Sequence, residues 1–141
     1  MIISLKKIPP KTTATARAHK SEAQEQSDLI EWAESCVRLK VHPELKLLHA
    51  IPNGGSRDIR EAKNLKRQGV KAGVPDLCLP VPKGNYHGLY IEMKVGRNKP
   101  SANQKEWLAA LSANGYAVAV CYGAAEARRR IEEYLRLEKK Q

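Results

Sequence analysis

Gly73-Val74-Pro75-Asp76 and Leu89-Tyr90-Ile91-Glu92-Met93-Lys94 are the two stretches of sequence that decide the fold. The second stretch alternates in the way expected of a β-strand with one apolar face. Glu92 and Lys94 are two residues apart, so their side chains leave the same face of the strand. The alternating apolar residues leave the other face; they are Leu89, Ile91, Met93 and Val95. Because Asp76 lies at the start of a second strand, we expect it to bring another carboxylate to the same place.

Helix and strand signals on either side of these stretches give an order of helix, strand, helix, strand, strand, helix, strand, helix. Ser21 with Gln24, and Ser101 with Gln104, have the spacing of capping boxes that begin helices. The predicted elements are a helix over 21–40, a strand over 46–51, a helix over 56–68, strands over 74–81 and 89–95, a helix over 101–114, a strand over 116–122 and a helix over 124–138. The short connection between the two middle strands makes them antiparallel neighbours. The order predicts an α/β domain with a mixed four-stranded sheet flanked by helices.

The 141 residues suit a single domain, and the formal net charge of +10 favours a polyanionic partner, most commonly nucleic acid. Residues 1–20 are basic and contain no acid, which predicts a flexible arm before a domain over 21–141. No apolar stretch approaches the roughly 18–20 residues that span a bilayer. The absence of a long apolar segment near the N-terminus and the dispersed cysteines (Cys36, Cys78, Cys121) predict a cytoplasmic protein with reduced thiols.

The carboxylates of Asp76 and Glu92 are hard oxygen ligands of the kind that Mg²⁺ or Mn²⁺ prefers. We expect the backbone carbonyl of Met93 to point to the same place and to add a third ligand. Lys94 either orients and deprotonates a water molecule or stabilises negative charge on a phosphate in the transition state. Two carboxylates and an amine beside a divalent cation predict a site for phosphodiester hydrolysis.

The first helix supplies a further candidate, Glu25, which recurs with the apolar residues at helical spacing. A carboxylate on the buried side of a helix is costly unless it is paired or bound to a metal ion. Glu25 is therefore expected to approach the same edge of the sheet and to bind a second cation or a water molecule held by the cation. Glu22, one turn earlier, is the alternative.

In order and spacing, the chain resembles the PD-(D/E)xK nuclease superfamily and, within it, the stand-alone virus-type replication-repair nuclease (VRR-NUC) domains of phage and bacterial genomes. The resemblance extends over about residues 21–123. The matching stretches are Ser21–Gln26, Ile51–Gly55, Gln68–Leu77, Tyr90–Lys94, Ser101–Trp107 and Gly115–Val118.

The resemblance implies a restriction-endonuclease-like core and a metal-dependent DNA endonuclease with Asp76, Glu92 and Lys94 as its central residues. It also implies accessory roles for Glu25 and Gln104, although capping alone explains the glutamine. Related stand-alone domains are similar to Holliday-junction resolvases, which act on branched DNA as homodimers. The resemblance therefore implies a homodimer in the cytoplasm of a bacterial or phage-infected cell. A flap or nicking endonuclease and a non-catalytic nucleic-acid-binding module are the alternatives.

Basic and polar residues flank the proposed site in the sequence, and we expect them to bind DNA phosphates. Aromatic residues are few and form no stacking pattern, so recognition of DNA shape is favoured over recognition of bases. The predicted DNA-binding residues are Arg57, Arg60, Lys63, Lys66, Arg67, Lys71, Arg97, Asn98 and Lys99.

Overall fold

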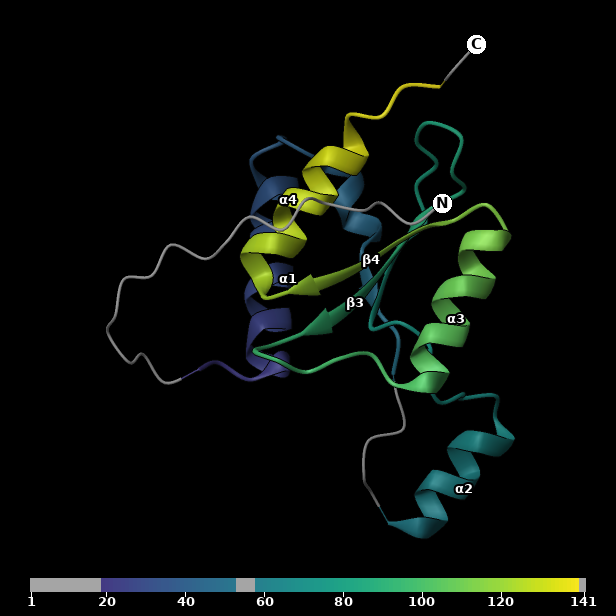
Figure 1. Cartoon of the computed structure of the whole chain (residues 1–141). Coiled ribbons are helices and arrows are strands. Elements are labelled where there is room, and N and C mark those ends of the chain that lie inside the picture. The colour runs from purple at the N-terminus through teal and green to yellow at the C-terminus, as the bar shows by residue number, and fades with distance from the viewer. Residues whose placement is uncertain (1–18, 53–57, 140–141) are drawn as a thin grey trace.

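A mixed four-stranded sheet lies at the centre of the computed structural model, which describes residues 19–52 and 58–139 (Figure 1). The strands are β1 (His49–Ala50), β2 (Leu77–Leu79), β3 (Leu89–Lys94) and β4 (Ala117–Tyr122), in that spatial order. β2 pairs antiparallel with both β1 and β3, whereas β3 and β4 are parallel. The predicted mixed sheet with antiparallel middle strands is confirmed.

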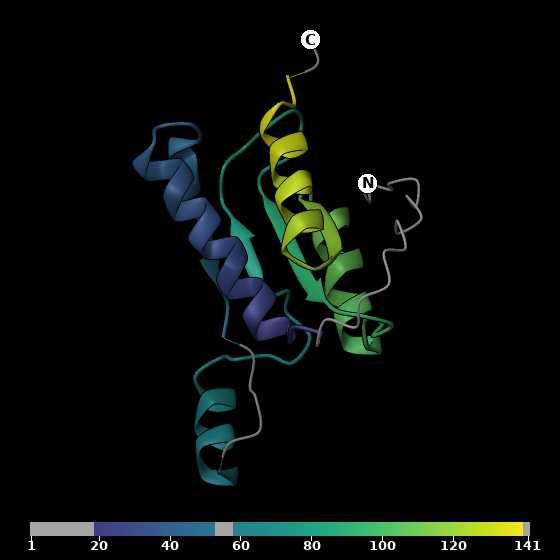
Figure 2. The ribbon, with the colours of Figure 1, turned by 90° about the vertical axis from the view of Figure 1, so that its left-hand side faces the viewer.

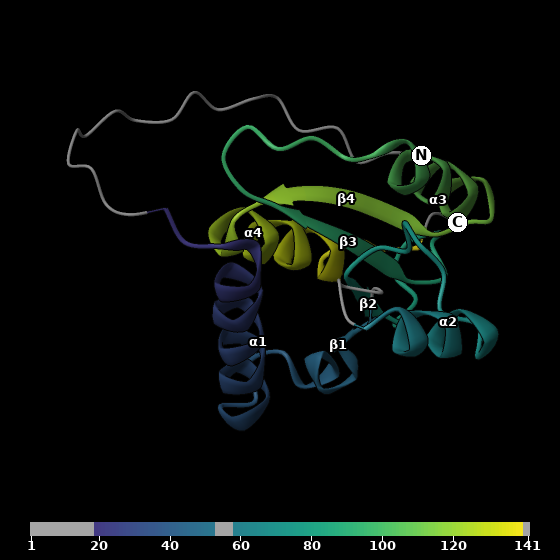
Figure 3. The same ribbon diagram turned by 90° about the horizontal axis from the view of Figure 1, so that it is seen from below.

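Helices cover both faces of the sheet, and the side chains of β3 that lie on the two faces differ in polarity. α1 (Glu22–Arg38) and α4 (Ala124–Leu135) pack on one face, and α3 (Ala102–Ala113) packs on the other (Figures 2 and 3). The main hydrophobic core lies between the sheet and the α1–α4 pair, where the apolar side chains of β3 are fully buried. The α3 face therefore receives the polar side chains of β3, as the alternation predicts.

Both predicted capping boxes are present. The hydroxyl of Ser21 accepts from the N–H of Gln24 at 3.2 Å, and the side chain of Gln24 accepts from the N–H of Ser21 at 2.9 Å. Ser101 and Gln104 repeat the arrangement at the start of α3. Each pair satisfies N–H groups that the first turn of a helix leaves without partners.

Several predicted boundaries differ from the structure. The segment predicted as a strand over 46–51 begins instead with a 3₁₀ helix, η1 (Pro43–Leu47), and only His49–Ala50 forms a strand. Leu45 of this 3₁₀ helix packs into the core, and a short apolar run in the sequence does not separate such a turn from a strand. β2 is also shorter than the predicted strand over 74–81, since Pro75 has no N–H to donate to a sheet ladder.

The second helix, α2 (Ile59–Arg67), stands apart from the rest of the molecule, beyond the end of α3 that carries its first turn (Figure 1). Asp58 caps it by accepting from the N–H of Arg60 at 3.2 Å, whereas Ser56, at which the helix was predicted to begin, lies outside the described residues. None of its residues is buried. α2 is thus held mainly through its flanking segments, not by core packing.

Part of the predicted N-terminal arm (residues 1–18) and Arg57 also lie outside the described residues. None of the helices that the structure describes is long and apolar enough to cross a membrane.

Candidate active site

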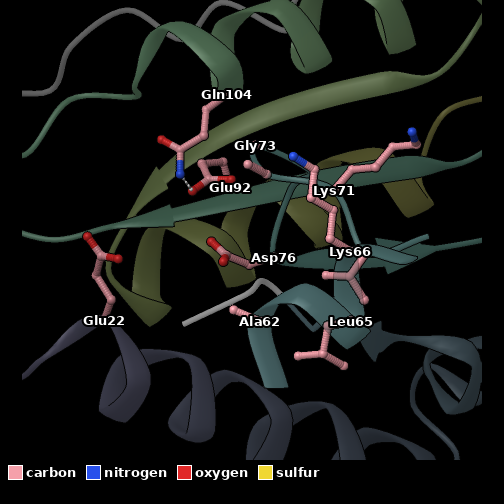
Figure 4. Close-up of a pocket in the computed structure, with 11 residues that line it drawn as sticks. Glu22, Ala62, Leu65, Lys66, Lys71, Gly73, Asp76, Glu92 and Gln104 are labelled. Atoms are coloured by element: carbon pink, nitrogen blue, oxygen red, sulfur yellow. Dashed lines mark hydrogen bonds between the residues drawn. The ribbon is translucent and has the colours of Figure 1, made fainter. Parts of the chain in front are cut away.

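Asp76 and Glu92 come together where β2 begins and β3 approaches its end. Asp76 immediately precedes Leu77, which pairs with Ile91, so the antiparallel register brings the two carboxylates to neighbouring positions. The N–H of Met93 donates to Oδ2 of Asp76 at 2.7 Å, which fixes the orientation of that carboxylate. Figure 4 shows the Asp76 and Glu92 side chains directed into the same pocket.

Glu92 is almost entirely buried, with 1% of its surface exposed. Its Oε1 accepts from Nε2 of Gln104 at 2.9 Å and lies 3.5 Å from Nζ of Lys94. Its Oε2 is buried and accepts no hydrogen bond from any described residue. Burial, and next the negative charge of Asp76, raise the pKa of Glu92 to about 7, while the Lys94 ammonium opposes the shift.

Lys94 completes the predicted triad at the last position of β3. Its side chain is largely buried, and its ammonium forms the ion pair with Glu92 described above. Its backbone carbonyl accepts from the N–H of Gly123 at 3.0 Å. Lys94 is not among the residues that line the pocket, so its ammonium, with three N–H donors, joins the site through its ion pair with Glu92.

Gln104 serves the helix cap and the site at the same time. Its Oε1 accepts from the N–H of Ser101 at 2.9 Å, while its Nε2 donates to Glu92. The two interpretations that the sequence left open are therefore compatible, because they use different atoms of one amide.

Gly73 brings the segment before β2 close to α3, a contact that sequence reasoning missed. Its φ of 91° belongs to the left-handed region, and a Cβ there would lie 2.7 Å from the backbone of Asn103. Only glycine allows this approach without displacement of the first turn of α3, which carries Gln104. The signal in the sequence was a glycine three residues before Asp76, since a close approach of the backbone to another segment is a common reason for glycine.

The structure separates the two glutamates at the start of α1. Glu22 lines the pocket together with Asp76 and Glu92, and its Oε1 accepts from Nδ2 of Asn98 at 3.4 Å. Glu25 does not line that pocket; its Oε2 accepts from the N–H of Ala124 at 2.7 Å, at the start of α4. The alternative, Glu22, is therefore the α1 carboxylate that the structure brings to the pair (Figure 4).

The pocket has a volume of about 740 Å³ and lies between this acidic wall and α2. Ala62, Leu65 and Lys66 line it from α2, and residues 70–73 line it from the segment that follows. Lys66 and Lys71 carry positive charge to this side (Figure 4). The acidic wall thus faces a wall that is partly apolar and partly basic.

The remaining predicted DNA-binding residues within the described part of the chain are exposed. Arg60, Lys63 and Arg67 lie on α2, and Arg97 and Lys99 lie on the loop between β3 and α3. That loop is tied to β4, because the hydroxyl of Tyr122 donates to the carbonyl of Asn98 at 2.9 Å.

A divalent cation fits the donors that are present. The unpartnered Oε2 of Glu92 beside a second carboxylate is a position where a positive charge would satisfy a buried acceptor. Among the described residues, no three His, Cys, Asp or Glu side chains gather closely enough to form a complete protein cage. Mg²⁺ needs no such cage, since it commonly keeps several waters and binds one or two carboxylates together with substrate phosphate.

The fold and the arrangement of Asp76, Glu92 and Lys94 together define a protein of the PD-(D/E)xK nuclease type. The model of the VRR-NUC domain matches residues 13–125, and the chain belongs to this family. A solved structure of a "VRR_NUC domain protein" is 32% identical to it, with a TM-score of 0.71, over 85% of this chain and 92% of that chain. Comparison with curated proteins gives no match.

Proposed function

We propose that the protein is a Mg²⁺- or Mn²⁺-dependent DNA endonuclease that hydrolyses phosphodiester bonds at branched DNA such as four-way (Holliday) junctions. The observation that carries the proposal is the cluster of Asp76, Glu92 and Lys94. Glu92 is buried and one of its oxygens accepts no hydrogen bond from a described residue, while the two carboxylates line a pocket that Lys66 and Lys71 also line. Membership of a nuclease family agrees with this chemistry.

Asp76 and Glu92 would hold the cation, with the predicted help of the Met93 carbonyl. When bound, the cation supplies Lewis acidity and neutralises charge on the phosphate. Gln104 keeps the Glu92 carboxylate in one orientation through its 2.9 Å hydrogen bond. Glu22, on the opposite side of the pocket, is placed to accept a hydrogen bond from an ordered water.

Lys94 would act as a donor. An ammonium paired with a carboxylate has three N–H donors and no acceptor, so it can donate to the attacking water and to a phosphate oxygen. This role stabilises the charge that develops in the transition state. Of the two roles that the sequence left open for Lys94, we therefore favour charge stabilisation.

The positive charges at the pocket support recognition of DNA through its phosphates. Lys66 and Lys71 line the pocket, and the other cations of α2 are exposed beside it. The described residues that line the pocket include no aromatic side chain on which a base could stack. Recognition of backbone shape is the mode that this surface favours, and a homodimer in a cytoplasmic setting would offer two such sites to the two strands of a junction.

Cleavage of three labelled DNA substrates tests the proposal. A four-way junction, a flap and an intact duplex would each be incubated with protein and Mn²⁺, Mg²⁺ or a chelator. We expect paired symmetric nicks in the junction, no cutting with the chelator, and no cutting by Asp76→Ala despite retained binding. Cuts confined to the flap would show a flap endonuclease and not a junction-cutting enzyme. Tight binding without cleavage under every condition would show a non-catalytic nucleic-acid-binding module.

A further inference from the structure

We infer that Glu25 is a positioning residue, which holds Lys94 and Glu22 in place through the N-terminus of α4. The inference rests on the proposed function for its catalytic consequence. It assigns to Glu25 a role other than the cation-binding role expected from the sequence.

The first observation concerns the cap of α4. Gly123 is its N-cap residue and has no side chain with which to accept from the first N–H groups of the helix. Glu25 supplies the missing acceptor from α1, through the 2.7 Å bond from the N–H of Ala124 to its Oε2. A carboxylate at a helix N-terminus also interacts favourably with the helix dipole, and charge-assisted bonds of this kind are strong.

The second observation connects this cap to the active site. The N-cap residue of α4, Gly123, donates its own N–H to the carbonyl of Lys94 at 3.0 Å. A Cβ on Gly123 would lie 3.5 Å from Oε2 of Glu25, so the carboxylate packs directly on this glycine. Glu25, the turn at 123–124 and the backbone of Lys94 thus form one continuous set of contacts.

The third observation is that Glu25 lies one turn after Glu22 on α1. Fixing Glu25 to α4 fixes the rotation of the first turn of α1 about its axis. That rotation directs Glu22 to the pocket, where it meets Asn98. One hydrogen bond therefore connects the two segments that carry Glu22 and Lys94.

Two substitutions separate positioning from cation binding. Glu25→Gln keeps an oxygen that accepts from Ala124 but removes the charge, and Glu25→Ala removes both. Glu31→Ala, an exposed glutamate on the same helix, is the matched control. Single-turnover cleavage would be measured at saturating DNA, as a function of Mn²⁺ concentration and well below the melting temperature of each variant.

We expect Glu25→Ala to lower the cleavage rate on the order of 10- to 100-fold, since a displacement of about 1 Å has effects of this size. Its DNA dissociation constant should stay within about twofold of the wild-type value, because the cations that bind phosphates are untouched. Glu25→Gln should recover most of the rate and keep the wild-type Mn²⁺ dependence. A Glu25→Gln protein that is as slow as Glu25→Ala and needs more Mn²⁺ would overturn the inference, as would wild-type rates in both variants.

Amide chemical shifts test the same contacts without reference to catalysis. In Glu25→Ala, the ¹⁵N–¹H signals of Glu22, Lys94, Gly123 and Ala124 should shift more than those of the opposite end of α1, whereas Glu31→Ala should leave all four in place. If they do not move, the contacts proposed for Glu25 are absent. This measurement remains decisive even if the wild-type protein cuts none of the DNA substrates, so failure of the inference and failure of the proposed function are distinguishable.

Discussion

The carboxyl groups of half-buried Asp76 and buried Glu92 lie close together, and the pKa of Glu92 shows the electrostatic consequence. Its pKa is raised from 4.5 to about 7, first by burial and then by Asp76. Without a cation, the folded protein therefore holds a proton that the unfolded chain releases as the pH rises above 4.5. The stability associated with this group is complete below pH 4.5 and is lost as the pH rises through about 7.

Asp76→Asn should consequently stabilise the protein in the presence of a chelator at pH 8. The substitution removes the repulsion and keeps an oxygen that accepts from Met93. We expect a melting temperature higher by roughly 2–5 °C, a size typical of about 1 kcal/mol in a domain of this length. The stabilisation of the wild-type protein by Mn²⁺ should disappear in the variant. A lower melting temperature than wild type in the chelator would contradict this account, and Glu31→Gln is the surface control.

At the scale of secondary-structure elements, the first turn of α3 combines a cap with an active-site contact. Ser101 contributes only to the cap, whereas Gln104 contributes to the cap and holds Glu92. This division allows the two effects to be measured separately at neighbouring positions.

Ser101→Ala should destabilise the protein by about 1 kcal/mol and leave cleavage nearly unchanged, because it removes only a capping hydroxyl. Gln104→Ala should have a similar effect on stability but slow cleavage on the order of tenfold or more, since the Glu92 carboxylate loses its neutral donor. Chemical denaturation and single-turnover cleavage would be compared for the two variants. Equal rates would remove Gln104 from the site.

α2 contributes no buried residue to the core, so its sequence is better explained by binding than by stabilisation of the fold. It is strongly charged, no residue in it is buried, and Lys66 lines the pocket. Its cations are therefore available for phosphate contacts.

Lys66→Ala combined with Arg67→Ala should weaken DNA binding and flatten its salt dependence by about one unit of slope for each lost contact. Unfolding free energy should change by less than about 0.5 kcal/mol, as for surface substitutions. Binding would be measured by fluorescence anisotropy over a range of salt concentrations. Arg129→Ala combined with Arg136→Ala, at exposed positions on and just after α4, is the control, and an unchanged slope in the α2 variant would exclude that helix from the interface.

At the scale of the whole molecule, each chain carries a single copy of the Asp76, Glu92 and Lys94 cluster and of the pocket that the two carboxylates line. Symmetric cutting of a junction requires two such sites, which is the reason for proposing a homodimer. The +10 charge of the chain suits a large polyanionic partner.

Solution mass, measured with and without junction DNA, should correspond to two chains. When wild-type protein is mixed with an excess of Asp76→Ala, most of the junctions that are cut should carry a single nick, because nearly every wild-type chain is then in a mixed dimer with one working site. If the amount of paired nicks depends only on the amount of wild-type protein and not on the added variant, the two cuts do not require such a dimer.

The sequence alone determined the order of the elements, the two capping boxes and the positions of Asp76, Glu92 and Lys94. These features depend on residues close together in the chain, where strand alternation and helix-cap spacing act directly. Only the tertiary structure decided that Glu22 faces the pocket while Glu25 caps α4, because the partner, Ala124, lies 99 residues away. The 3₁₀ turn of η1 and the lack of core packing of α2 likewise depend on tertiary packing, because a local sequence pattern does not show which other segment packs against an element.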